Sequence, residues 1–227
     1  MHRSLNSNIL EHHQSIIDGY VYRLSKDPSI RINLIATTWE EFEKQLVRHE
    51  VDLLLLGLNI PVSEENPNLF PAILTIRQLL QKFPALRILV ISMFRDVALI
   101  RALLDTGIRG FILKDDQASI QQLASIVCII AKGGSFISKG ALPTSEFNHP
   151  SLVFSCRQME ALSVCAAYPD SRTPDLAKLL GMADSTFRNL MSEIYQLLGV
   201  HTRAAAIVKA QQMGLLPLPH EPAYNSN

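Results

Sequence analysis

The sequence of 227 residues predicts a doubly wound, five-stranded parallel α/β sheet followed by a smaller all-α domain of four helices. Short apolar runs alternate with amphipathic stretches as far as residue 132, which is typical of a parallel sheet covered by helices. After residue 152 only helical periodicity remains. A stretch rich in Gly, Pro and Ser lies between the two halves. We therefore expect an α/β domain at 1–132, a linker at 133–152 and a helical domain at 153–216.

The predicted strands are short and largely apolar. They lie at residues 5–10, 30–36, 51–56, 87–92 and 110–113. The runs VDLLLLGL and RILVIS are apolar throughout instead of alternating with polar residues. Such runs favour central parallel strands that are covered on both faces.

The predicted helices each carry one apolar stripe at helical spacing. In the first half they lie at residues 15–24, 39–47, 73–83, 97–104 and 120–130, and in the second half at 157–167, 174–180, 185–198 and 203–213. The short turn at 181–183 gives the second and third of the C-terminal helices the proportions of a helix-turn-helix. The tail at 217–227 is expected to be disordered.

The composition excludes several classes of protein. Hydrophobic residues make up 48% of the chain and charged residues 19%, which argues against disorder. No apolar run is long enough to span a membrane, and the N-terminus lacks the pattern of a signal peptide. We therefore expect a cytoplasmic protein with no membrane partner. The three cysteines fit neither a disulfide framework nor a zinc site, and are expected to be reduced core thiols.

The net charge is zero, because 21 Lys and Arg balance 21 Asp and Glu. A protein coated in basic patches would have a clear positive excess. Any nucleic-acid binding is therefore expected to come from a small local site.

The two halves together resemble the NarL/FixJ family of response regulators over nearly the whole chain. The residues that carry the resemblance are the strings PALRILVISMFRD, ALLDTGIRGFILKD, FSCRQMEAL, LAKLLGMADSTFRNLMSEIYQLLGV and AAIVKAQQMGLL. The resemblance implies a receiver domain that takes part in a two-component system, joined to a LuxR-type helix-turn-helix domain that binds DNA and regulates transcription.

The resemblance also implies a phosphorylation site, and this chain departs from its pattern. The family's phosphoacceptor Asp aligns with Gly57, and its Mg²⁺-binding acidic pair aligns with Glu11 and His12. Glycine has no side chain, so no acyl phosphate can form there, and the loss of one carboxylate weakens the Mg²⁺ site. The switch hydroxyl and the lysine of the family match Ser92 and Lys114. We therefore expect an atypical receiver that is not phosphorylated, with no cofactor and no metal.

Other interpretations of these residues stay open. Ser92 and Lys114 could form part of a pocket for an anion or small ligand, or could be relics that hydrogen-bond locally. Gly57 could reflect a slip of the alignment, although Pro61 follows at the family's spacing. His12 and His13 are adjacent, and a solvated loop is a simpler explanation for the pair than a metal site.

The helix at 185–198 aligns with the family's recognition helix. Arg188 and Asn189 stand near its N-terminal end, where such a helix meets base edges. Arg can donate two hydrogen bonds to guanine, and Asn can pair with adenine. The remaining candidates are polar or basic residues on this helix or at neighbouring helix ends that could contact phosphates. These candidate DNA contacts are Thr173, Lys178, Ser185, Thr186, Ser192, Thr202 and Arg203.

The helical half carries few cations for a DNA-binding domain. Six basic residues face five acidic ones, namely Arg157, Arg172, Lys178, Arg188, Arg203 and Lys209 against Glu160, Asp170, Asp175, Asp184 and Glu193. Phosphate neutralisation dominates DNA affinity, so one copy should bind weakly. A dimer places two recognition helices in successive grooves. We therefore expect a homodimer, or a heterodimer with another regulator, on double-stranded DNA.

Two other classes of function compete with this one. The chain could be a protein-interaction module that binds a kinase, RNA polymerase or another regulator, and the polar Ser192, Glu193 and Gln196 favour that alternative. An enzyme is not expected, because the sequence contains no nucleophile–base set, phosphate-cradling glycine loop or metal cluster.

Overall fold

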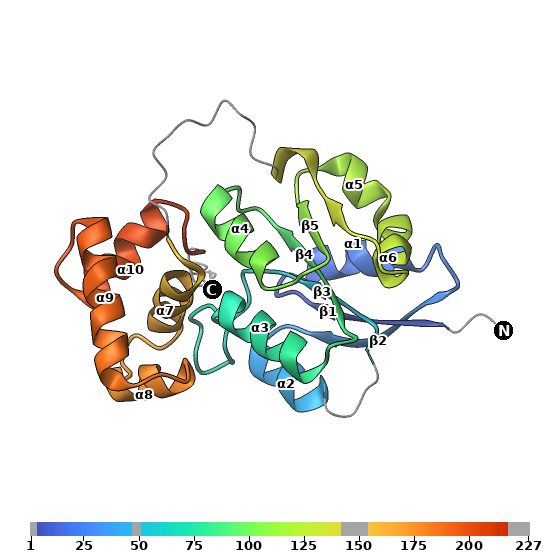
Figure 1. Ribbon diagram of the computed structural model, residues 1–227. Coiled ribbons are helices and arrows are strands. Elements are labelled where there is room, and N and C mark those ends of the chain that lie inside the picture. Colours follow the sequence, from blue (N-terminus) through green and yellow to red (C-terminus); the bar gives the residue numbers. More distant parts are fainter. Residues whose placement is uncertain (1–3, 47–50, 142–153, 218–227) are drawn as a thin grey trace, which may run out of the picture.

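The computed structural model describes residues 4–46, 51–141 and 154–217. Figure 1 shows two parts side by side, an α/β part that ends at residue 141 and a helical part that begins at residue 154. The predicted disordered tail at 217–227 lies almost wholly outside the described residues, as does most of the predicted linker.

The α/β part is built on one parallel sheet with the strand order β2-β1-β3-β4-β5-β6. The strands are β1 (Leu5–Leu10), β2 (Ile30–Ala36), β3 (Leu53–Leu56), β4 (Arg87–Ser92), β5 (Gly110–Leu113) and β6 (Phe136–Ile137). Every residue of β3 and β5 is buried, as expected for central strands covered on both faces.

The prediction of five strands was wrong, because the sheet has a sixth. Strand β6 lies inside the predicted linker, and its Phe136 donates a backbone hydrogen bond to Arg109. Gly133, with φ of 92°, makes the turn that lets the chain return to the sheet edge. Two residues are too few to show a period in the sequence, so only the backbone pairing reveals this strand.

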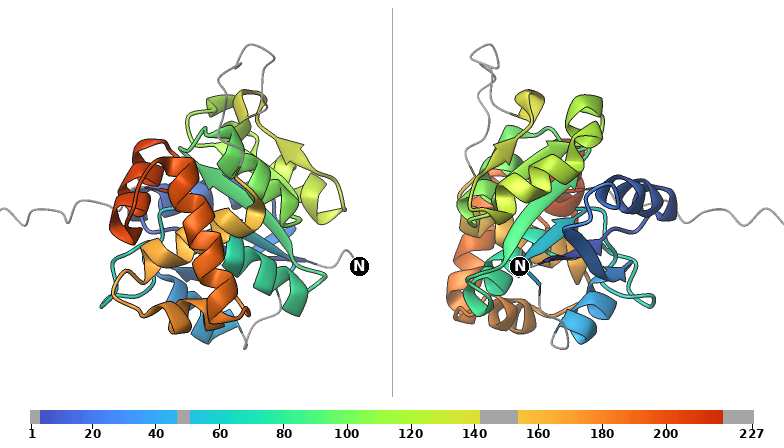
Figure 2. Two further views of the ribbon diagram at one scale, coloured as in Figure 1. Left: turned by 60° about the vertical axis from the view of Figure 1, so that its left-hand side comes forward. Right: turned by 90° about the vertical axis from the view of Figure 1, so that its right-hand side faces the viewer.

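Helices cover both faces of the sheet (Figures 1 and 2). Helices α1 (Gln14–Leu24) and α6 (Leu123–Ala131) pack together on one face. The other face carries α2 (Trp39–Leu46), α3 (Ala72–Lys82) and α4 (Val97–Asp105). The single helix predicted at 120–130 is instead two, because α5 (Gln117–Gln121) ends one residue before α6 begins.

The helical part contains α7 (Cys156–Ala167), α8 (Thr173–Leu179), α9 (Asp184–Leu198) and α10 (Arg203–Gln212). Helix α7 begins with a capping box, in which Ser155 and Gln158 satisfy each other's backbone donors. Helix α9 ends at Gly199, whose φ of 65° is the left-handed conformation that stops a helix. These caps explain why the predicted boundaries and the observed ones agree to within about two residues.

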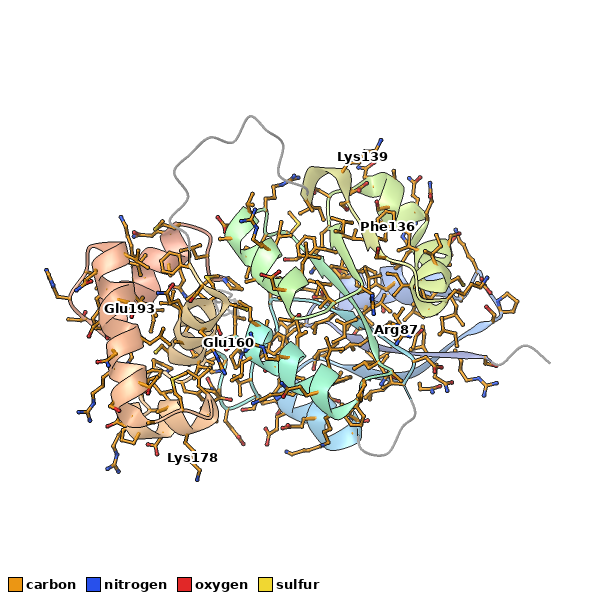
Figure 3. All side chains as sticks on the ribbon, viewed as in Figure 1. Arg87, Phe136, Lys139, Glu160, Lys178 and Glu193 are labelled. Carbon is orange, nitrogen blue, oxygen red and sulfur yellow. The ribbon has the colours of Figure 1, made fainter. Side chains whose placement is uncertain are left out.

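The two parts share a continuous apolar core. Helix α7 packs against α3 and α4, and buried side chains run without a break from the sheet into the helical part. Polar contacts join the same surfaces. Arg77 forms an ion pair of 2.7 Å with the fully buried Glu160 (labelled in Figure 3), and Asn66 donates a hydrogen bond to the carbonyl of Ala167. Helix α7 is thereby held on the α/β part.

No helix among the residues described at 4–46, 51–141 and 154–217 is long and apolar enough to cross a membrane.

Candidate nucleic-acid interface and predicted phosphorylation site

Helix α9 lies on the outside of the molecule, away from the α/β part (Figure 1), and crosses the front in the left view of Figure 2. Its apolar stripe of Phe187, Met191, Ile194 and Leu198 is buried against α7, α8 and α10. The period of this stripe turns the polar side chains of the helix outward. The polar face of α9 is therefore open to a large partner.

Arg188 and Asn189 are both exposed on this outer face. The guanidinium of Arg188 donates to the carboxylate of Asp184, one turn earlier, at 2.5 Å. An exposed pair of this kind contributes at most about 1 kcal/mol. A guanine edge or a phosphate could therefore replace Asp184 as the partner of Arg188 at little cost.

A groove of about 760 Å³ runs beside α9 and brings several predicted contacts together. Thr173, Arg188, Ser192 and Arg203 all line it, although they come from three different helices. Arg172 also lines the groove and is exposed, and the sequence analysis did not select it. Its place just before a helix that starts with Thr173 and a proline was the signal that could have found it.

The side chains of two candidates already form hydrogen bonds that stabilise the helical part. The guanidinium of Arg203 donates to the carbonyls of Pro169 and Ser171, at 2.6 and 2.8 Å, and so ties α10 to the turn before α8. The hydroxyl of Thr202 caps α10 by accepting from the backbone N–H of Ala205. Both positions stay predicted DNA contacts, but their side chains are occupied within the fold.

Three further candidates lie on the surface outside the groove, and Ser192 makes a bond within its own helix. Ser185 and Thr186 are exposed in the first turn of α9, where the helix N-terminus favours phosphate. Lys178 is exposed on α8 and points away from the rest of the molecule (Figure 3). The hydroxyl of Ser192 donates to the carbonyl of Arg188 within the helix.

The residues predicted to form a degenerate phosphorylation site meet at the carboxyl ends of the strands. The carboxylate of Glu11 is 1% exposed and accepts a hydrogen bond of 2.8 Å from the ammonium of Lys114. A Cβ atom placed on Gly57 would come within 2.7 Å of this carboxylate. Glu11 therefore occupies the space into which a side chain at position 57 would project.

The neighbouring polar residues are bonded locally. The backbone N–H groups of His12 and His13 donate to Glu11, and the ring of His13 lies 3.2 Å from the same carboxylate. The buried hydroxyl of Ser92 accepts from the backbone N–H of Phe94. The sequence favoured a solvated loop for His13, whereas its ring contacts Glu11, and its position two residues after Glu11 was the signal for this contact.

The described residues were also compared with the requirements of a metal site and of a reactive thiol. In the described part of the chain, no group of three or more His, Cys, Asp or Glu side chains could hold a metal ion. The three cysteines are free thiols, of which Cys165 is buried and Cys128 and Cys156 are half-buried. Burial raises the pKa of Cys165 to about 12, so its thiol stays protonated and unreactive.

Comparison with known proteins places these features in context. No protein-family model matches the chain. The chain is similar to the transcriptional regulatory protein DegU of Brevibacillus brevis, with 22% identity over 242 residues that cover 94% of this chain and 98% of DegU. It is also similar to the oxygen regulatory protein NreC of Staphylococcus carnosus, with 21% identity over 221 residues that cover 92% of this chain and 97% of NreC.

Solved structures of RcsB share the fold. The structure of RcsB from Salmonella enterica serovar Typhimurium bound to promoter rprA, in the presence of phosphomimetic BeF3⁻, matches with a TM-score of 0.61 and 18% identity, covering 92% of this chain and 99% of that chain. A structure of two RcsB dimers bound to two parallel DNAs matches with a TM-score of 0.55 and 19% identity, covering 92% and 98%.

The fold and the site together define a class of protein, in which a receiver-like parallel α/β sheet is joined to a helical part with an exposed polar helix. The similarity to DegU, NreC and RcsB extends over more than nine-tenths of the chain, and the RcsB structures share its fold.

Proposed function

We propose that this protein is a DNA-binding transcriptional regulator that acts as a dimer or with a partner and is controlled independently of Asp phosphorylation. One observation carries the proposal: helix α7 makes the contact with the α/β part, which leaves the polar face of α9, with Arg188 and Asn189, exposed on the outside. A regulator that reads chromosomal DNA works where that DNA is, and we propose the cytoplasm as its location.

The proposed contacts divide the labour between bases and backbone. Arg188 and Asn189 would contact base edges, while Ser185 and Thr186 at the start of α9, and Arg172 on the groove, would contact phosphates. The relatives support this use of the helical part, because DegU is a transcriptional regulatory protein and RcsB has been solved on DNA.

A binding assay on selected DNA tests the base contact. After selection from a random pool, Arg188→Ala should lose about 1–3 kcal/mol of affinity for the selected site. Arg31→Ala, which removes an exposed arginine from edge strand β2, is the matched control and should bind as the wild type does. Equal retention of DNA by Arg188→Ala and the wild type would overturn the base-contact proposal.

The proposed dimer follows from the charge of the helical half. With six basic against five acidic residues, one copy can neutralise few phosphates. Two copies add their contacts, so the measured affinity should fall steeply on dilution below the dimer dissociation constant. Light scattering with and without DNA would measure the assembly, and tight binding by a single copy would contradict it.

Control without phosphorylation is supported by the arrangement around Gly57. The ammonium that would read a phosphoryl group pairs instead with Glu11, whose carboxylate fills the space beside Gly57. Acetyl phosphate or BeF3⁻ with Mg²⁺ should therefore leave the DNA affinity unchanged, and intact-protein mass spectrometry should detect no phosphoryl adduct. A stable acyl phosphate would refute this part of the proposal.

The second candidate function is a protein-interaction module that binds a kinase, RNA polymerase or another regulator. It is favoured by Glu193, an acidic residue on α9 that accepts a hydrogen bond of 3.2 Å from Gln158 of α7. An anion held on the recognition face repels phosphates. Capture of a partner by the full chain, together with no binding to any selected DNA, would decide for this alternative.

A further inference from the structure

A cavity of about 390 Å³ opens between α1 and α5 at the carboxyl ends of the strands. Its size is within the range of sites for small organic molecules. The walls are apolar, formed mainly by Ile16, Tyr20, Met93 and Ile120. Met93 is 59% exposed, which leaves an apolar surface open to solvent at this site. The cavity adjoins the Glu11–Lys114 pair, and Lys114 is part of its lining.

Cations stand among these apolar walls. Lys114 and Arg23 both line the cavity, and they come from different elements, Lys114 just after β5 and Arg23 on α1. The carboxylate of Glu11 occupies one donor of the Lys114 ammonium, which has three. The guanidinium of Arg23 forms no ion pair or hydrogen bond with any described residue. The lining therefore offers donors to an acidic group.

Tyr20 supplies a second, independent observation that points to a ligand. Its side chain is 5% exposed and lines the cavity, yet its hydroxyl has no hydrogen-bond partner among the described residues. Burial, and next the negative charge of Glu11, raise the pKa of Tyr20, so the hydroxyl remains a donor. A buried polar group without a partner is unfavourable. An acceptor on a bound molecule would satisfy it.

Gly19 keeps the space open. No atom lies within 4 Å of the position that a Cβ atom would take on this residue, which lies in the middle of α1 and lines the cavity. The backbone does not require glycine, because its φ is not positive. Glycine inside a helix costs about 1 kcal/mol relative to alanine. The cost is offset only if the open space is used.

From these observations we infer that the cavity is a binding site for a small amphipathic anion, a molecule with an apolar body and one acidic group. The acidic group would meet Lys114 and Arg23, the apolar body would pack on Ile16 and Ile120, and an oxygen would accept from the Tyr20 hydroxyl. This inference rests on the proposed control without phosphorylation, for which it supplies the class of signal.

Fluorescence titration of the full chain with 8-anilinonaphthalene-1-sulfonate, an apolar ring system with one sulfonate, tests the site. Octanoate should displace the dye, whereas octylammonium, which has the same tail and a positive charge, should not. Gly19→Leu fills the cavity with an apolar side chain and should abolish binding. Failure of octanoate to displace the dye, or full binding by Gly19→Leu, would overturn the inference.

Tyr20→Phe separates a ligand role from a structural one. It removes only the hydroxyl, so the free protein should keep or gain thermal stability, while the affinity for octanoate should fall about three- to tenfold. Tyr22→Phe removes an exposed hydroxyl from the same helix and should change neither quantity. Unchanged octanoate affinity in Tyr20→Phe would count against the site. Octanoate affinity and thermal stability are both measured without DNA. A failure of the proposed DNA binding would therefore leave these two results unchanged.

Discussion

The side chain of Glu11 lies where a side chain on Gly57 would begin. Glutamate is long enough to reach from the end of β1 to the neighbouring end of β3, and its carboxylate then pairs with Lys114 from the end of β5. A buried carboxylate needs a cation or several N–H donors, and here it has both. One acidic side chain thus serves three strand ends.

A double-mutant cycle tests whether Glu11 occupies the space that a side chain at position 57 would need. Gly57→Asp alone should destabilise the protein by about 1–3 kcal/mol, because its Cβ meets Glu11 and a second carboxylate enters the site. Glu11→Ala alone should also destabilise it, because Lys114 loses its partner. In the double variant one carboxylate remains beside Lys114, so the two losses should not add. Urea unfolding of the wild type, the two single variants and the double variant gives the four free energies of unfolding that the comparison needs.

If the losses of unfolding free energy in Gly57→Asp and Glu11→Ala were strictly additive, the two positions would not compete for the same space. Gly133 is a control position, since a Cβ there meets no atom within 4 Å but its φ of 92° makes substitution costly for a different reason. Gly133→Asp should therefore destabilise the chain equally with and without Glu11.

Helix α5 begins at a capping aspartate and ends at a break in the backbone that separates it from α6. Asp116 caps it, accepting from the hydroxyl of Ser119 at 2.6 Å and from the backbone N–H of the same residue. The backbone then breaks at Gln122, the residue between α5 and α6. Ile120 of α5 lines the cavity at the carboxyl ends of the strands.

Asp116 gives this element a dependence on pH. The hydroxyl of Ser119, followed by its backbone N–H, lowers the pKa of Asp116 in the folded state. The stability that its charge contributes is therefore present above the unfolded pKa of about 3.9 and is lost as the pH falls through the lower folded value. Asp116→Asn should be less stable than the wild type at neutral pH. The difference should narrow in strong acid, as measured by urea unfolding across pH.

A difference that widened on acidification would contradict this account of Asp116. Asp115→Asn, on an adjacent exposed aspartate that pairs with Arg95, is the comparison that shows the effect of removing a charge without removing a cap.

One buried acid contributes to the junction between the two parts of the molecule. Glu160 is fully buried and is shared by Arg77 of α3 and Arg157 of α7, at 2.7 and 3.1 Å. The same guanidinium of Arg77 donates to the sulfur of Cys156. Apolar side chains of both parts surround these groups in one core. The orientation that leaves α9 exposed therefore depends on contacts between α3 and α7.

Removing the cation from α3 should loosen this arrangement. Arg77→Met keeps the apolar stem but leaves Glu160 with Arg157 alone, which should cost about 1.5–3 kcal/mol. Small-angle scattering should then show a larger radius of gyration, and proteolysis should cut faster between the two parts. Arg109→Met, on an exposed arginine of the α/β part, is the matched control. An unchanged radius and cleavage rate would contradict the role of the ion pair.

The sequence by itself determined the order and type of the main elements, because periodicity is a local property of the chain. The apolar stripe of α9, the central runs of β3 and β4 and the glycine that ends α9 were all visible in it. It also predicted that Arg188 and Asn189 lie on the exposed side of α9. It missed β6, because the two residues of this strand pair with β5 elsewhere in the fold, and it missed the break at Gln122, which interrupts an otherwise continuous helical pattern.

Only the tertiary structure decided which side chains that are far apart in the sequence contact one another. The strand register brings Glu11 against Gly57 and Lys114, and the packing of α7 on α3 decides that α9 faces outward. It also places Arg172 on the groove and commits Arg203 to backbone carbonyls. The physical reason is that such contacts join residues far apart in the chain, so no local pattern carries them.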